Sequence, residues 1–146
     1  MIDVRIYSKE EFKDTGFTDD NVDQLSEDFF ICINASGHIH SVPHFAESHS
    51  NVLNCYFDDV GFNHIKFDLI FKMEFNAKAC TLDQAVEIKN FIDSLPNTCR
   101  LHIYCTKGKS RSPAVAKFVE EYKNNRFVDY ENHNRHVYSV LKSLTC

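Results

Sequence analysis

Residues 100–113 read RLHIYCTKGKSRSP, and their pattern indicates the class of fold. Its first part, 100–105, predicts a short strand. Residues 106–111 form a polar turn with one glycine. Ser112 followed by Pro113 is typical of a helix start, with serine as the N-cap and proline at the first helical position. The stretch therefore predicts a strand, a tight loop and a helix, the repeating unit of an α/β protein.

Further helices are predicted on both sides of this unit. Upstream, Thr81 and Gln84 have the spacing of a capping box, and a helix should follow until Pro96. Another capping-box pair, Ser8 and Glu11, predicts a short helix. The apolar positions at helical spacing are Ala85, Ile88, Ile92 and Leu95 in the Thr81 helix, Val115, Phe118, Val119 and Tyr122 after the loop, and Val137, Val140, Leu141 and Leu144 in a last helix.

Apolar runs predict the strands. Segments 4–7, 29–34 and 52–57 are short and apolar, and 29–34 is typical of a strand buried on both faces. Segment 65–75 is apolar at every odd position, which predicts a half-buried strand or an inserted hairpin that flanks the loop 106–111. Strands and helices alternate, so we expect an α/β fold with a central, mostly parallel or mixed sheet flanked by helices.

Length and composition indicate one globular domain over residues 1–146. The chain has 43% apolar and 25% charged residues, ordinary values for such a domain. No apolar run approaches the roughly 18 residues of a membrane span, and Met1-Ile2-Asp3 does not open a basic signal region, so we expect a cytoplasmic protein without a membrane span. The net charge of -5 gives no general footprint for nucleic acid, so any anion site must be local.

The sequence predicts neither a metal nor a cofactor. The cysteines have no C-x-x-C spacing, and reduced thiols are expected. Four histidines crowd one segment, but no nearby Asp or Cys completes a ligand set, which favours a polar connecting loop. The cysteines are Cys32, Cys55, Cys80, Cys99, Cys105 and Cys146, and the histidines are His38, His40, His44 and His49.

The loop has the chemistry of an anion site. A loop that ends on a helix N-terminus directs several backbone N–H groups at one point, and Gly108 permits the tight turn. Arg111 can offer a planar fork to two phosphate oxygens, while Lys107 and Lys109 either add charge or are simply solvated. Cys105 would lie beneath a bound dianion, where the same donors favour the thiolate and make it a nucleophile.

Residues Cys105 to Arg111 match the C-x5-R motif, with Gly108, Ser110 and Ser112 at the positions of the longer C-x-x-G-x-S-R-S form. The stretch resembles the loop of the cysteine-dependent protein tyrosine and dual-specificity phosphatases. The resemblance implies that Cys105 attacks phosphorus and that Ser112 stabilises the thiolate as it leaves. It also implies that the phosphate is bound by Thr106, Lys107, Gly108, Lys109, Ser110 and Arg111.

The resemblance further implies an aspartate on a nearby loop as the general acid. Asp58 and Asp59 follow the strand 52–57, as the acid follows a strand in small dual-specificity enzymes, and we favour Asp59. The pair could equally be turn acids that close a strand. Asp68 and Asp83 are weaker candidates, and Asp83 suits a first helical turn without any catalytic role. The chain has no tryptophan, which favours the dual-specificity-like branch over the type with a Trp-Pro-Asp loop.

The expected function is hydrolysis of phosphate monoesters, on phosphotyrosine with or without phosphoserine and phosphothreonine, in a phosphorylated protein or another phosphomonoester. Because two lysines are present in the loop, a phosphoinositide or an RNA 5′-phosphate is an alternative substrate, and nucleic acid is expected in no other role. A non-catalytic phosphate-binding module is a second alternative, since Tyr104 replaces the histidine that usually precedes the family's cysteine.

Overall fold

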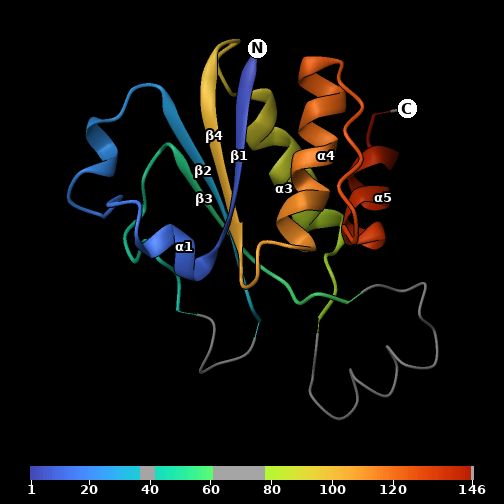
Figure 1. Ribbon diagram of the computed structural model, residues 1–146, viewed down its shortest axis with the longest axis horizontal. Coiled ribbons are helices and arrows are strands. Elements are labelled where there is room, and N and C mark those ends of the chain that lie inside the picture. The colour runs from blue at the N-terminus through green and yellow to red at the C-terminus, as the bar shows by residue number, and fades with distance from the viewer. Residues whose placement is uncertain (37–41, 61–77, 146) are drawn as a thin grey trace.

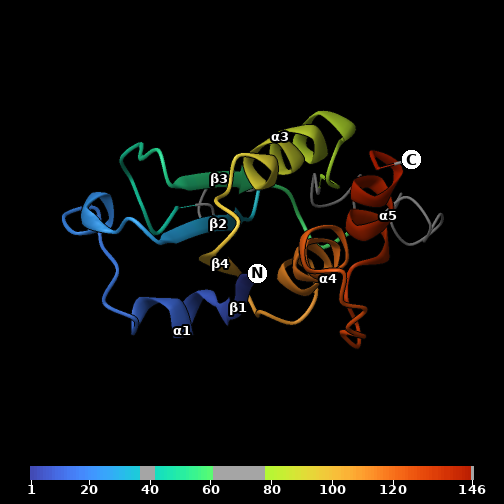
Figure 2. The ribbon, with the colours of Figure 1, turned by 90° about the horizontal axis from the view of Figure 1, so that it is seen from above.

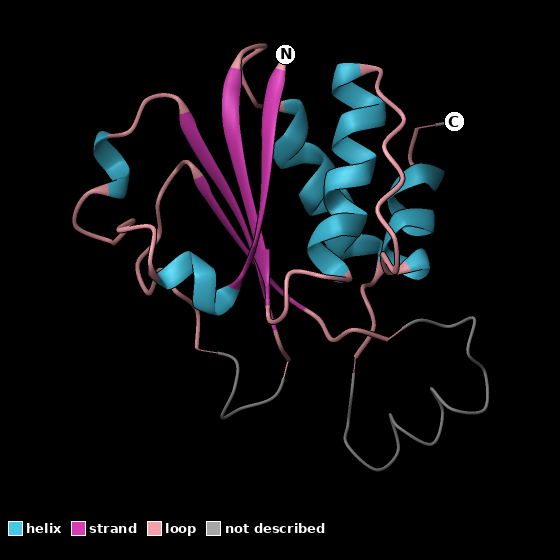
Figure 3. Ribbon diagram, in the orientation of Figure 1, coloured by secondary structure: helices cyan, strands magenta, loops and turns pink. Residues whose placement is uncertain are grey.

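The computed structural model describes residues 1–36, 42–60 and 78–145. At the centre of these residues is one sheet (Figure 3). Its strands are β1 (Ile2–Ser8), β2 (Asp28–Asn34), β3 (Val52–Tyr56) and β4 (Cys99–Cys105). They are parallel and lie in the order β1-β4-β2-β3 (Figure 2). The predicted strand or hairpin at 65–75 lies outside the described residues.

Helices cover both faces of this sheet. Helices α3 (Leu82–Asp93), α4 (Arg111–Asn124) and α5 (Arg135–Ser143) lie on one face (Figures 1 and 2). Helix α1 (Lys9–Lys13) and the 3-10 turn η1 (Val22–Gln24) lie on the other (Figure 1). The predicted α/β class, with a sheet flanked by helices, is confirmed. None of the described helices combines the length and apolar character that crossing a bilayer requires.

Strand β4 shows why the sheet needs cover on both sides. Its alternate residues Leu101, Ile103 and Cys105 join the core beneath α3, α4 and α5. Tyr104 points to the opposite face and joins a second, largely aromatic core with Phe12 of α1. The burial of both faces explains why the strands read as continuous apolar runs.

Both predicted capping boxes are formed. The Ser8 hydroxyl accepts from the Glu11 N–H at the start of α1, and Thr81 accepts from Gln84 at the start of α3. In each case the Glu or Gln side chain returns a bond to the cap residue's own N–H. These local signals set where the two helices begin.

Helix α4 begins two residues earlier than the sequence predicts. Its first residue is Arg111 and Ser110 is the N-cap, so Ser112 does not cap the helix and Pro113 is the third residue. Proline is tolerated there because the first-turn N–H groups have no acceptor within the helix. The earlier start places Arg111 and Ser112 in the first turn, directed toward the loop.

The parallel arrangement gathers the functional segments at one edge. The register aligns Ser8 of β1 with Cys105 of β4, and the loops after β2 and β3 begin at the same edge. In α/β proteins this carboxyl edge is where ligands bind.

Candidate active site

Cys105 is the last residue of β4, and its sulfur is buried at the base of the loop. The Ser112 hydroxyl lies 3.1 Å from Sγ, and the Ser112 N–H donates to Sγ at 3.5 Å. Burial opposes a charge on the sulfur, but the bonds from Ser112, the positive Arg111 and the Gly108 N–H outweigh it and lower the pKa of Cys105. The thiolate is the form that acts as a nucleophile.

The other described cysteines have the opposite electrostatics. All are free thiols, and burial raises the pKa of each one. The pKa of Cys80, for example, is raised to about 12. The group comprises Cys32, Cys55, Cys80 and Cys99. A depressed thiol pKa therefore distinguishes Cys105 within the described part of the chain, and this environment is built by the loop.

Gly108 lets the loop pack against the end of β1. Its φ of +69° is in the left-handed region, and a Cβ there would lie 2.6 Å from Ser8 N and 2.7 Å from Tyr7 C. A side chain at this position would push the loop away from β1. The adjacent Thr106 carbonyl accepts from the Lys9 N–H at 3.3 Å, so the junction of β1 and α1 supports the loop.

Arg111 lies behind the loop and is only 6% exposed. Its Nη1 donates to the Phe57 carbonyl at 2.8 Å, and its Nη2 donates to the Thr106 hydroxyl at 3.0 Å. Within the described ranges, its buried Nε has no hydrogen-bond partner. A guanidinium N–H without a partner is suited to donate to an oxyanion.

Lys107 and Lys109 both project from the loop as exposed side chains. Neither forms an ion pair with a described acidic residue. Their positive charge is therefore available to an incoming anion but is not directed at Cys105 by any contact.

Asp58 has a structural role, because its carboxylate holds two loops together. Its carboxylate accepts from the Ser36 N–H at 3.1 Å, from the Ser36 hydroxyl and from the Lys78 N–H at 2.8 Å. Partial burial opposes the charge, but these hydrogen bonds outweigh it and lower the pKa of Asp58. The carboxylate is held in its ionised form and joins the loop after β2 to the segment before α3.

Asp59 is exposed and bound to the loop itself. Its Oδ1 accepts from the Ser110 hydroxyl at 2.6 Å and from Asn134 Nδ2 at 2.8 Å. The structure thus brings Asp59 together with the predicted phosphate-binding residues. Asn134 was not anticipated from the sequence, where its one local signal is an N-cap before α5.

The remaining candidates fall elsewhere. Asp83 is exposed in the first turn of α3, where it suits the helix dipole. Asp68 lies outside the described residues. Tyr104 faces away from Cys105: its hydroxyl donates to Asn34 Oδ1 at 2.8 Å and accepts from the His44 N–H at 3.1 Å. Tyr104 therefore belongs to the core under α1.

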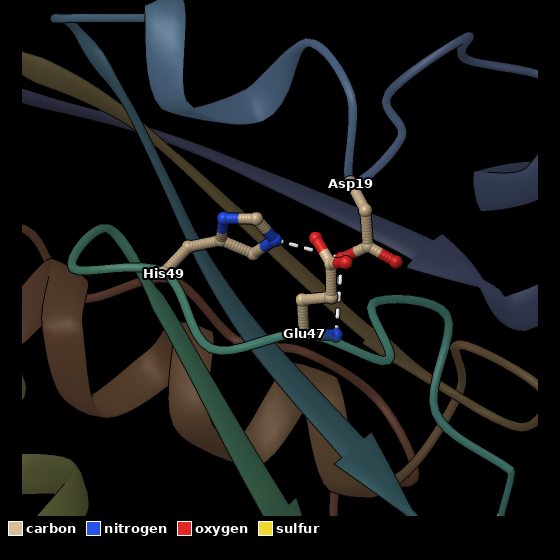
Figure 4. Close-up of side chains that lie close together, drawn as sticks. All are labelled: Asp19, Glu47 and His49. Atoms are coloured by element: carbon tan, nitrogen blue, oxygen red, sulfur yellow. Dashed lines mark hydrogen bonds and ion pairs between the residues drawn. The ribbon is translucent and has the colours of Figure 1, made fainter.

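The sequence has no nearby Asp or Cys to complete a ligand set with the histidines, but the structure brings Asp19 to His49 from 30 positions away. Asp19 and Glu47 converge on His49, with one ligand atom of each within 4.8 Å of the others (Figure 4). His49 Nε2 lies 2.7 Å from Asp19, and Nδ1 lies 2.7 Å from Asp23. Only an imidazolium donates from both ring nitrogens, so this geometry is that of an ion-pair clamp. His38 and His40 lie outside the described residues.

We predict that this clamp makes stability pH-dependent. The hydrogen bond to Asp19 is the largest cause of the raised pKa of His49. A raised pKa in the folded state adds stability that is complete below the ordinary value of about 6.5 and is lost as pH rises through the raised value. Urea unfolding from pH 6 to 9 should show a difference between wild type and His49→Gln that shrinks with pH. A constant difference would contradict the clamp.

Comparison with known proteins gives no match: no protein-family model fits the chain, and no curated protein or solved structure is significantly similar to it.

Proposed function

We propose that the protein is a phosphatase that hydrolyses phosphate monoesters through a cysteinyl-phosphate intermediate on Cys105. The observation that carries the proposal is the position of Cys105 Sγ, which lies 3.1 Å from the Ser112 hydroxyl and accepts from the Ser112 N–H in the first turn of α4. These contacts lower the pKa of the Cys105 thiol, whereas burial raises the pKa of the other described cysteines. The thiol lies at the start of the loop, the Ser112 and Gly108 N–H groups bond to its sulfur, and Arg111 Nε has no partner among the described residues. A nucleophile and an anion-binding site in contact fit phosphoryl transfer.

In the first step, Cys105 Sγ attacks phosphorus. The P–S bond forms while the bond from phosphorus to the leaving oxygen breaks, and Asp59 gives its proton to that oxygen. Arg111 and the loop N–H groups hold the non-bridging oxygens, where charge is stabilised in the transition state.

In the second step, water attacks the cysteinyl-phosphate. Asp59, now ionised, takes a proton from the water, the P–O bond forms and the P–S bond breaks. The Ser112 hydroxyl, 3.1 Å from Sγ, donates to the departing thiolate. Inorganic phosphate leaves and Asp59 is protonated again.

Asp59 suits the acid role better than Asp58. The Asp58 carboxylate accepts hydrogen bonds from Ser36 and Lys78, which lower its pKa. It is therefore held ionised and has no proton to donate. Asp59 is exposed at the loop and has no described partner on Oδ2. Oδ2 is therefore the oxygen that would carry the proton to a leaving group.

The experiment compares Asp59→Asn with Asp58→Asn, which differ by one position in the same segment. With p-nitrophenyl phosphate in EDTA and reductant, Asp59→Asn should lower kcat by about 10²-fold because the leaving oxygen departs unprotonated. Asp58→Asn should chiefly lower the thermal unfolding temperature, with kcat within a few-fold of wild type. A larger loss of kcat in Asp58→Asn would reverse the assignment of the acid.

The substrate is a phosphorylated protein or another phosphomonoester, and phosphotyrosine is the first candidate. The exposed Lys107 and Lys109 favour a second candidate, a phosphoinositide or RNA 5′-phosphate. Comparing kcat/KM on phosphopeptides, phosphoinositides and 5′-phosphorylated RNA would decide between the two substrate classes. A higher kcat/KM on the polyanions in wild type, lost in Lys109→Ala, would support the second candidate. A wild-type protein that binds vanadate but hydrolyses none of them would be a phosphate-binding module.

A further inference from the structure

Asn134 lies where three functional segments meet. Its backbone N–H donates to the Ser110 carbonyl of the loop at 2.9 Å. Its Nδ2 donates to Asp59 Oδ1 at 2.8 Å and lies 3.4 Å from the Val60 carbonyl. Its Oδ1 accepts from the Val137 N–H at 3.0 Å and so caps α5. Asn134 therefore joins the loop 106–111 through its backbone, and Asp59 and helix α5 through its side chain.

The contacts of Asp59 are confined to one oxygen. Oδ1 accepts from both Ser110 Oγ, at 2.6 Å, and Asn134 Nδ2, at 2.8 Å, while Oδ2 has no partner in the described part of the chain. A protonated carboxyl has one O–H donor, and its other oxygen only accepts. Because Oδ1 already accepts two bonds, the proton of the acid form resides on Oδ2.

We propose that Asn134 is a positioning residue for the general acid: it keeps Oδ1 of Asp59 as the accepting oxygen and directs the protonated Oδ2 at the leaving group. The inference rests on the proposed function and adds to it a determinant outside the C-x5-R motif. The cap of α5 fixes the Asn134 amide, because its Oδ1 is committed to Val137 and its Nδ2 must then face Asp59.

Substitutions can separate positioning from capping. Asn134→Asp keeps the size and the N-cap acceptor, but it replaces the donor that faces Asp59 with an acceptor. Asn134→Ser also keeps a good N-cap and the backbone bond to Ser110, but its side chain is too short to reach Asp59. Asp59→Asn provides the background in which the positioned proton is absent.

The readout is the dependence of kcat/KM on the leaving group. A poor leaving group, as in phenyl phosphate, needs the proton, whereas the leaving group of 2,4-dinitrophenyl phosphate departs without it. For phenyl phosphate, Asn134→Asp should lower kcat/KM roughly 10- to 100-fold, because small misplacements of a catalytic group cost this much. For dinitrophenyl phosphate, the change should stay within about 3-fold. Asn134→Ser should show the same selectivity, and neither variant should add selectivity in the Asp59→Asn background.

The outcomes separate the two claims. An equal fall on both substrates, or no fall on either, in variants whose thermal unfolding shows a folded protein would overturn the positioning role while the phosphatase stands. Selectivity that an Asn134 substitution adds to that of Asp59→Asn alone would also overturn it, since the effect would then not act through Asp59. A wild-type protein inert on both substrates would overturn the proposed function and this inference with it.

Discussion

Cys105→Ser is expected to lower kcat on p-nitrophenyl phosphate by at least about 10⁴-fold, as the loss of a nucleophile does in other covalent enzymes. The donors around Sγ favour an ionised thiol, but a serine hydroxyl stays protonated in the same environment. The oxyanion contacts from Arg111 and the loop N–H groups persist. The variant should therefore still bind vanadate or a phosphotyrosine peptide, which calorimetry measures.

Cys99→Ser is the matched control for this variant. Cys99 is buried at the first position of the same strand, with a raised rather than lowered pKa. Its substitution should change stability but leave kcat within a few-fold of wild type. If both variants retained full activity, Cys105 would not be the nucleophile.

Arg111→Lys is expected to lower kcat/KM by roughly 10²- to 10³-fold, the typical cost of removing a preorganised donor from an oxyanion site. The guanidinium spans from the Phe57 carbonyl to the Thr106 hydroxyl and still presents Nε. An ammonium is a point charge and cannot reproduce this fork. The loss should appear in the steady-state rate and in weaker vanadate inhibition.

Arg100→Lys is the control, because it removes an arginine that forms a two-bond pair far from Cys105. Arg100 forms a two-bond pair with Asp28 at 2.8 and 2.9 Å near the start of β4, at the other end from Cys105. This substitution should reduce stability without changing vanadate inhibition. If Arg111→Lys behaved in the same way, Arg111 would be a structural residue.

The sequence predicts most of the fold because its signals are local. The capping boxes at Ser8 and Thr81, the apolar strands and the loop glycine each act within a few residues, and the structure contains them where expected. The start of α4 is mispredicted because Ser112-Pro113 is itself a good helix-start pair. In the structure Ser112 instead contacts Cys105, and the helix begins at Arg111.

The contacts that complete the site depend on the topology of the chain. Asn134 bonds to Asp59 across 75 positions, and His49 meets Asp19 across 30. No local pattern encodes such pairs, because they form only once the sheet order brings the loops together. The two candidate acids also become distinct only in three dimensions, where Asp58 is committed to Ser36 and Asp59 is bound to the loop.

A covalent mechanism on Cys105 can be tested by identifying the residue that is phosphorylated during turnover. Protein mixed with substrate in EDTA is quenched in acid within the first turnovers, digested, and analysed by mass spectrometry for a phosphoryl group on the peptide that contains Cys105. We expect phosphate on the sulfur of Cys105, its disappearance when substrate is exhausted, and no such adduct in Cys105→Ser. Hydrolysis that proceeds with no phosphate on Cys105, or with phosphate on another residue, would contradict this mechanism.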